Sequence, residues 1–231
     1  MIIKQNYWKI FKDKRLVLFD MDGTVTKTED LNYEIYKNVI NKIFDLELCK
    51  KDWGIFFSGR SPKESLTEYS AKHNILITQS LLNNLLTEIY KSKNQKLRRK
   101  NYKIKIVRGF VEFVKILKKE DFKTGLVTST SRDFVKIILS KTQTTDYFDK
   151  IITRENCKVG KPNPDIYFFA MRLLRMNPKD TIIFEDSQSG LMAAVNSGAT
   201  VIKIGRKQTS VETKFKIINY VSLLDYKNSV T

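Results

Sequence analysis

The sequence predicts an α/β protein with a parallel sheet, helices on both faces of the sheet, and an inserted all-helical cap domain. Two observations lead to this prediction. Over most of the chain, short apolar segments alternate with amphipathic segments of about ten residues, which is typical of βαβ units and a parallel sheet. Residues 28–100 depart from this alternation and show helical patterns only.

The expected strands are short apolar runs that end in polar residues. Leu16–Phe19 comes first and is followed at once by Asp20, a pattern typical of a strand buried in a parallel sheet. The further strands that we expect are Thr124–Thr128, Lys150–Ile152, Thr181–Phe184 and Val201–Ile204. The helices that we expect between them are Gly109–Lys119, Arg132–Ser140, Pro164–Arg175 and Ser189–Ser197.

The helical insert divides the chain into two expected domains. Its first helix repeats apolar residues every four positions from Leu31 to Ile43, as an amphipathic helix does. The helices expected in it are Leu31–Phe44, Pro62–His73 and Ser80–Arg99. We therefore predict an α/β core of residues 1–27 and 101–231, and a cap of residues 28–100. Both ends of the cap return to the same edge of the sheet, so it can act as a hinged lid.

Composition excludes several protein classes. The chain has 231 residues, of which 42% are hydrophobic, enough to bury a core and too many for an intrinsically disordered chain. No apolar run is long enough for a membrane span, and Leu16–Phe19 is too short for a signal-peptide core. Cys49, Cys157 and the single histidine, His73, do not supply a structural zinc site or a two-histidine zinc protease site. The two distant cysteines fit a reducing compartment. We expect a cytoplasmic monomer without membrane attachment.

The net charge of +17 indicates an affinity for anions. Nucleic acid, anionic lipid and phosphorylated metabolites all remain open on this ground, and lysines spread over solvated faces explain the charge equally well. The most basic tract is Lys91–Lys105, with eight basic residues and no acid. Few aromatic residues accompany it, which does not favour a surface that stacks single-stranded nucleic acid. We interpret the tract as a solvated cap helix.

Acidic residues follow two of the expected strands. Asp20 and Asp22 come after the first strand, and Glu185 and Asp186 follow Thr181–Phe184. The carboxyl ends of parallel strands gather ligands at one edge of the sheet, where a carboxylate can attack phosphorus or hold Mg²⁺. Each pair also has an ordinary explanation, because Asp-x-Asp-Gly is a common turn and Asp186 precedes a helix as an N-cap can.

Two further segments offer groups that bind anions. Lys161 lies between Gly160 and Pro162, whose ring restricts the backbone and can help to present the ammonium group to an anion. The strand Thr124–Thr128 ends in consecutive hydroxyl residues, which can donate hydrogen bonds to a phosphoryl oxygen. A plain loop lysine and helix-capping hydroxyls remain the alternatives.

The order of these motifs resembles the haloacid dehalogenase superfamily of phosphoryl-transfer enzymes, in the branch of β-phosphoglucomutases and small-metabolite phosphatases. The resemblance covers nearly the whole chain and implies a Rossmann-like core with a helical cap. The matching positions are Asp20–Thr24, Thr128, Lys161, Glu185–Asp186 and the Ser-x-x-Gly of Ser187–Gly190.

The resemblance implies a role for each catalytic residue. Asp20 would be the nucleophile that forms an aspartyl-phosphate. Asp22 would protonate the leaving oxygen and then activate the acceptor. Thr128 and Lys161 would bind the transferring phosphoryl group. Two smaller steps through a covalent intermediate are easier than one, and Asp22 must change its protonation between them.

The resemblance also implies a Mg²⁺ cofactor. Asp20, the backbone carbonyl of Asp22, and Asp186 would hold the ion, with Glu185 in support. An anionic carboxylate approaches a phosphate dianion only when cations neutralise the charge, so both Mg²⁺ and Lys161 are needed.

Departures from the mutase pattern favour hydrolysis. β-Phosphoglucomutases carry a histidine where this chain has Asn32, an arginine where it has Pro62, and an aspartate where it has Lys27. We therefore predict a Mg²⁺-dependent phosphatase that hydrolyses a small phosphorylated metabolite such as a sugar phosphate. A phosphomutase is the first alternative, and a basic nucleic-acid-binding or partner-binding module with a secondary phosphatase site is the second. The expected substrate-binding residues are Thr28, Arg60, Ser129 and Thr130.

Overall fold

The computed structural model describes residues 2–225, and its centre is a parallel six-stranded sheet. The strands lie in the order β4-β3-β2-β5-β6-β7. Their bounds are β2 (Leu16–Phe19), β3 (Lys123–Val127), β4 (Lys150–Ile152), β5 (Thr181–Glu185), β6 (Thr200–Ile204) and β7 (Phe215–Ile217). All of the ladders in this sheet are parallel, so the predicted fold class is confirmed.

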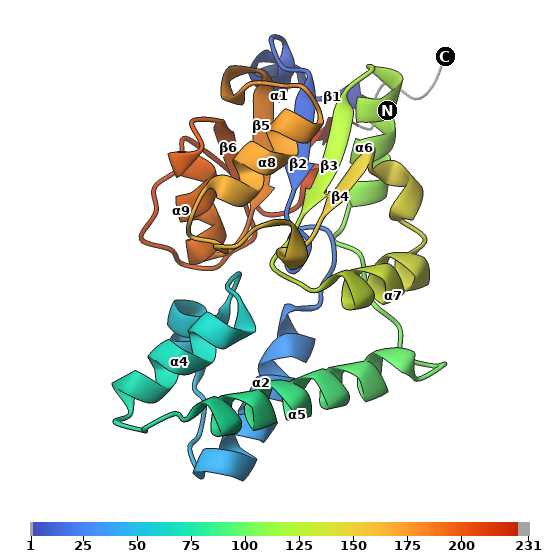
Figure 1. The fold of residues 1–231 in the computed structure, drawn as a ribbon. Coiled ribbons are helices and arrows are strands. Elements are labelled where there is room, and N and C mark those ends of the chain that lie inside the picture. Colours follow the sequence, from blue (N-terminus) through green and yellow to red (C-terminus); the bar gives the residue numbers. More distant parts are fainter. Residues whose placement is uncertain (1, 226–231) are drawn as a thin grey trace.

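Strand β2 lies inside the sheet and is buried on both faces. Its side chains alternate, so that Val17 and Phe19 belong to one apolar cluster, whereas Leu16 and Leu18 belong to the other. Helices α6 (Phe110–Lys119) and α7 (Arg132–Thr142) contribute to the first cluster. Helices α8 (Asp165–Leu173) and α9 (Gln188–Asn196) contribute to the second, so that the sheet is covered on both sides (Figure 1).

A group of helices between β2 and β3 lies at one end of the sheet (Figure 1). It consists of α2 (Glu29–Phe44), α3 (Lys50–Asp52), the π-helical turn η1 (Trp53–Phe57), α4 (Pro62–Lys72) and α5 (Gln79–Arg98). The chain enters and leaves this group side by side, since Lys27 N–H donates to the carbonyl of Lys105 at 2.8 Å. The division into a core and a cap at residues 28 and 100 stays a prediction, and we use "cap" for residues 28–100.

Some elements were not expected from the sequence. Strand β1 (Ile2–Ile3) pairs antiparallel with β8 (Leu224–Asp225), and helix α1 (Gln5–Phe11) follows β1. Both strands are too short to show a periodic pattern. The 3₁₀ turns are η2 (Thr145–Tyr147), η3 (Arg154–Asn156), η4 (Pro178–Asp180) and η5 (Tyr220–Leu223). Within residues 2–225 no helix combines the length and apolarity needed to cross a membrane.

Several predicted boundaries were wrong by one or two residues. Strand β3 ends at Val127 rather than Thr128, and β5 continues through Glu185. Helix α7 continues past Ser140 to Thr142, whose hydroxyl donates to the carbonyl of Ile138 one turn earlier. The helix then ends because Gln143 adopts a left-handed backbone with φ +54°.

Candidate active site

The residues after β2 and β5 meet at the point where the strand order reverses. The two strands are neighbours in the sheet, with Phe19 opposite Phe184, so the acids that follow them lie at one edge. Gly23 makes this close approach possible. Its φ is +90°, and a Cβ atom at this position would lie 2.2 Å from Asp186 Oδ2. Only glycine fits both the turn and the contact.

Lys161 joins two of the acids in the interior. Its ammonium group donates to Asp20 Oδ1 at 2.7 Å and to Glu185 Oε1 at 2.5 Å. The lysine side chain has no exposed surface, and Asp20 is 5% exposed. Burial opposes the lysine charge, but Asp20 and Glu185 raise the pKa of Lys161 well above its ordinary value. Burial and then Glu185 raise the pKa of Asp20, against the effect of Lys161. Lys161 is therefore a fixed cation beside Asp20.

Both carboxylate oxygens of Glu185 are engaged by donors. Oε1 also accepts from the Tyr167 hydroxyl at 2.9 Å. Oε2 accepts from the backbone N–H groups of Asp186 and Ser187, at 3.0 and 3.2 Å. These contacts hold Glu185 in place and suit it to a supporting role beside a cation.

Asp186 presents a free oxygen in a buried position. Its Oδ1 has no hydrogen-bond partner among the described residues, whereas Oδ2 accepts from Lys207 Nζ at 2.6 Å. Burial raises the pKa of Asp186 to about 7, although the nearby Lys207 lowers it. One carboxylate oxygen from each of Asp20, Glu185 and Asp186 lies within 4.8 Å of the other two. Three buried carboxylates with one unpartnered oxygen fit a hard divalent cation such as Mg²⁺.

Asp22 lies apart from this cluster, with its carboxylate held by neutral donors. Oδ1 accepts from the Thr28 hydroxyl and from Asn32 Nδ2, the latter at 3.1 Å. Oδ2 accepts from the Thr130 hydroxyl at 2.7 Å. Thr28 and Asn32 come from the cap side of the chain and Thr130 from the core, so Asp22 is fixed where the two meet. A carboxyl held in this way at the pocket wall can exchange a proton with a ligand.

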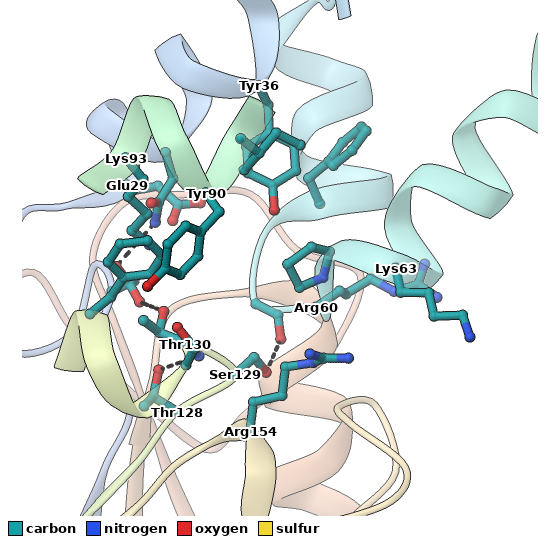
Figure 2. Close-up of a pocket in the computed structure, with 18 of the residues that line it drawn as sticks. Glu29, Tyr36, Arg60, Lys63, Tyr90, Lys93, Thr128, Ser129, Thr130 and Arg154 are labelled. Atoms are coloured by element: carbon teal, nitrogen blue, oxygen red, sulfur yellow. Dashed lines mark hydrogen bonds between the residues drawn. The ribbon is translucent and has the colours of Figure 1, made fainter. Parts of the chain in front are cut away.

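The hydroxyl residues after β3 line the floor of the site. Thr128 Oγ1 accepts from the backbone N–H of Thr130 at 3.1 Å. Ser129 Oγ donates to the carbonyl of Gly59 at 2.9 Å, which ties the core to a cap loop. Thr128, Ser129 and Thr130 therefore all lie at the pocket, as Figure 2 shows.

A cavity of about 300 Å³ lies between core and cap. Asp20 and Asp22 line it together with aromatic cap residues that include Tyr36 (Figure 2). Arg60 also lines it, but its guanidinium is paired with Glu68, and NH1 lies 2.7 Å from Oε2. The cap thus supplies both apolar surface and charge to the pocket.

Sequence reasoning missed Lys93 of α5. The tract that contains it was interpreted as solvated, and for Lys93 this was wrong, because the residue is 8% exposed and lines the pocket. The signal was present, since Leu85, Ile89, Lys93 and Leu97 recur every four residues on the buried face. Lys93 Nζ lies 4.9 Å from the centre of the Phe134 ring. Burial lowers the pKa of Lys93.

Arg154 and Lys207 were missed as well. Arg154, in η3, lines the pocket next to Ser129 (Figure 2). Lys207 lies in the loop after β6 and reaches Asp186. Arg154 comes from a 3₁₀ turn and Lys207 from a loop. Neither segment has a periodic pattern, so nothing in the sequence separates these residues from the many surface lysines and arginines.

Comparison with known proteins identifies the family of the chain. Residues 17–204 match the family model of haloacid dehalogenase-like hydrolases. The chain belongs to this family. The predicted family and hydrolase class are therefore confirmed.

Individual relatives span most of the chain. A phosphorylated carbohydrates phosphatase of Thermotoga maritima is 29% identical over 79% of this chain and 81% of its own length. A β-phosphoglucomutase of Bacillus subtilis is 28% identical over 84% of each chain. The crystal structure of a β-phosphoglucomutase from Clostridium difficile superposes with a TM-score of 0.81 at 21% identity, covering 91% of this chain and 93% of the other. The last similarity concerns the fold alone.

Proposed function

We propose that this protein is a Mg²⁺-dependent phosphatase of a small phosphorylated metabolite, and that it acts through an aspartyl-phosphate. The family assignment and the phosphatase relative from Thermotoga maritima support this proposal. The observation that carries it is the arrangement around Asp20. The buried carboxylate of Asp20 lies 2.7 Å from the ammonium group of Lys161 and close to the acids Glu185 and Asp186. Asp22 lines the same pocket and is held by other residues.

In the first step an Asp20 oxygen attacks the phosphorus of the monoester. The bond from phosphorus to the ester oxygen breaks, and the protonated Asp22 gives its proton to that oxygen. Lys161 and Thr128 stabilise the charge on the transferring group. In the second step Asp22 takes a proton from water, the water oxygen attacks the phosphorus, and the bond to Asp20 breaks to release inorganic phosphate.

Asp20, the Asp22 carbonyl and Asp186 would hold Mg²⁺, with Glu185 in support. The ion would neutralise charge between the carboxylate and the phosphoryl group. Thr28, Asn32 and Thr130 hold the Asp22 side chain away from the cation cluster, which leaves it available for proton transfer.

Phosphate release tests this proposal. Sugar phosphates, phosphoglycolate, nucleotides and glycerol phosphate are incubated with the protein, with Mg²⁺ or with EDTA. We expect release from part of the panel, and loss of at least a thousandfold in Asp20→Asn and with EDTA. Asp146→Asn, which changes an exposed carboxylate, is the matched control and retains activity. Release that persists in Asp20→Asn would show a different mechanism, and no release from any substrate would contradict hydrolysis.

A phosphomutase is the second candidate, favoured by the Bacillus subtilis relative. Against it, Asn32 rather than a histidine donates to Asp22. Conversion of β-glucose 1-phosphate into glucose 6-phosphate without phosphate release would support the mutase. The cytoplasmic location and the monomeric state stay predictions.

A further inference from the structure

We propose that Lys207 is a positioning residue that couples the cap to the cation site, because its ammonium group binds the core acid Asp186 and the cap acid Glu29 at once. The inference rests on the proposed function to the extent that Asp186 holds Mg²⁺. In this arrangement a divalent cation bound at Asp186 weakens the contact between Lys207 and Glu29 that joins the core to the cap, and that contact in turn weakens the binding of the cation.

The contacts of Lys207 cross from core to cap. Nζ lies 2.6 Å from Asp186 Oδ2, 2.9 Å from Glu29 Oε1 and 3.2 Å from Ser58 Oγ. The two carboxylates are largely buried, with side-chain exposures of 4% for Asp186 and 16% for Glu29. The Lys207 side chain is 37% exposed, but both acids that it binds are shielded, so solvent screens this link less than it screens an ion pair between two exposed side chains.

The loop that carries Lys207 is fastened to the core. Lys203 Nζ, at the end of β6, donates to the backbone carbonyl of Lys207 at 2.6 Å. Further along the loop, Gln188 and Ser210 exchange two hydrogen bonds, since Ser210 N–H donates to Gln188 Oε1 at 2.8 Å and Gln188 Nε2 donates to Ser210 Oγ at 2.6 Å. Because the backbone is fixed, Lys207 meets Glu29 only where the cap is seated on the core.

On the cap side, Glu29 accepts hydrogen bonds from other cap residues as well as from Lys207. Its Oε1 also accepts from the indole N–H of Trp53 at 2.9 Å and from the Ser58 hydroxyl. Glu29 directly follows Thr28, whose hydroxyl donates to Asp22. The Lys207 link therefore fixes the start of α2 and the η1 turn, and it places the indole of Trp53 next to the linked acid.

The charge of Lys207 sets the direction of the coupling. A divalent ion at Asp186 would stand close to the ammonium group, and two cations at that distance repel each other. Such coupling is reciprocal: if the cation weakens the contact between Lys207 and the cap, then removing Lys207 strengthens cation binding.

The test measures Mg²⁺ binding and the environment of Trp53 in the full chain. Trp8 and Trp53 are the two tryptophans, so a Trp8→Phe background makes Trp53 the sole reporter. Mg²⁺ affinity is measured by calorimetry, and Trp53 fluorescence is followed in the same titration. In this background we expect Mg²⁺ to change Trp53 fluorescence. We expect Lys207→Met to bind Mg²⁺ about tenfold more tightly and to lose the fluorescence response. Lys207→Arg, which keeps the charge, retains an affinity within threefold of the parent.

Lys118→Met is the control, because Lys118 forms an ion pair with Asp149 at 2.7 Å, outside the site. It should leave affinity and fluorescence response unchanged. If Lys207→Met binds Mg²⁺ as the parent does, or keeps the fluorescence response, the coupling is refuted while the phosphatase proposal stands. Asp186→Asn is expected to bind no Mg²⁺. If the parent also binds none, both proposals fail together.

Discussion

The ammonium group of Lys161 lies 2.7 Å from Asp20 Oδ1, and the lysine side chain has no exposed surface. Glu185 contacts the same ammonium group at 2.5 Å, so one cation is shared by two buried carboxylates. Glu185 has no exposed surface and Asp20 is only 5% exposed, so little solvent is available to replace Lys161. The lysine therefore matters to the stability of the core as well as to the chemistry proposed for Asp20.

We expect Lys161→Met to destabilise the protein by about 3–5 kcal/mol, because it leaves buried carboxylates without their cation. Urea unfolding near neutral pH measures the loss. Lys136→Met, which changes an exposed lysine of α7, should stay within about 0.5 kcal/mol of the parent. Where Lys161→Met does not fold, the double variant with Glu185→Gln should recover part of the stability, because one anion is removed. A stable Lys161→Met would contradict the role of the lysine as counter-ion.

Gly59 lets the cap loop approach the core. Its φ is +75°, and a Cβ atom there would lie 2.1 Å from Ser187 Oγ. We expect Gly59→Ala to lower the free energy of unfolding by about 1–3 kcal/mol and to reduce kcat/KM, because the loop must move away from Ser129 and Ser187. Thermal unfolding and phosphate release measure both effects. Gly54→Ala is the matched control, since a Cβ atom at Gly54 meets nothing within 4 Å. Equal effects of the two substitutions would show that the contact with Ser187 does not matter.

The core of the site could be predicted because it follows strand ends. Asp20 comes directly after an apolar run, and Asp186 comes directly after β5, one residue beyond the end of its apolar run. Parallel strands bring such positions together whatever the loops do. Strand β7 could not be found in the same way. It has three residues, Phe215–Ile217, with an exposed lysine at its centre, so it offers no apolar run.

The residues that meet across the cap were harder to find. Lys207 reaches Asp186 and Glu29 from a loop whose path depends on tertiary hydrogen bonds. Lys93 carried a usable signal, its place in the apolar repeat of α5, but the charge of the surrounding tract pointed to solvent. The charge of a tract is an average over its residues, whereas the burial of each residue in a helix depends on the face of the helix on which it lies.

Lys93 gives a prediction on substrate binding. It lines the pocket with 8% exposure, and none of the hydrogen bonds and ion pairs identified among residues 2–225 engages its ammonium group. We expect Lys93→Met to raise KM for an anionic substrate at least tenfold, with a smaller effect on stability, because a buried cation in the pocket is replaced by an apolar chain. Steady-state kinetics on the best substrate of the panel measures this. Lys91→Met, two residues earlier and exposed, should leave KM unchanged. An unchanged KM in Lys93→Met would place the substrate away from α5.

The contacts of Asp149, away from the active site, predict that the stability of the protein depends on pH. Its Oδ2 accepts from the buried N–H of Thr124 at 2.7 Å, and Lys118 Nζ lies 2.7 Å from Oδ1. Partial burial acts to raise the pKa of Asp149, but the hydrogen bonds from Lys118 and the Thr124 N–H hold it below its ordinary value.

Because the folded pKa of Asp149 is the lower one, its contribution is present above the unfolded pKa of about 3.9 and is lost as pH falls through the folded pKa. We expect Asp149→Ala to cost about 1 kcal/mol near neutral pH, since the carboxylate is partly exposed and the substitution leaves the Thr124 N–H unpaired. The difference from the parent should shrink below about pH 4, where the unfolded chain takes up a proton at Asp149 before the folded chain does. Urea unfolding of both proteins across this range isolates Asp149, because the other carboxylates are common to both. Asp146→Ala on the same loop is the control and should show no pH-dependent difference. A gap between Asp149→Ala and the parent that stays constant down to about pH 3 would mean that the carboxylate charge adds nothing to these hydrogen bonds.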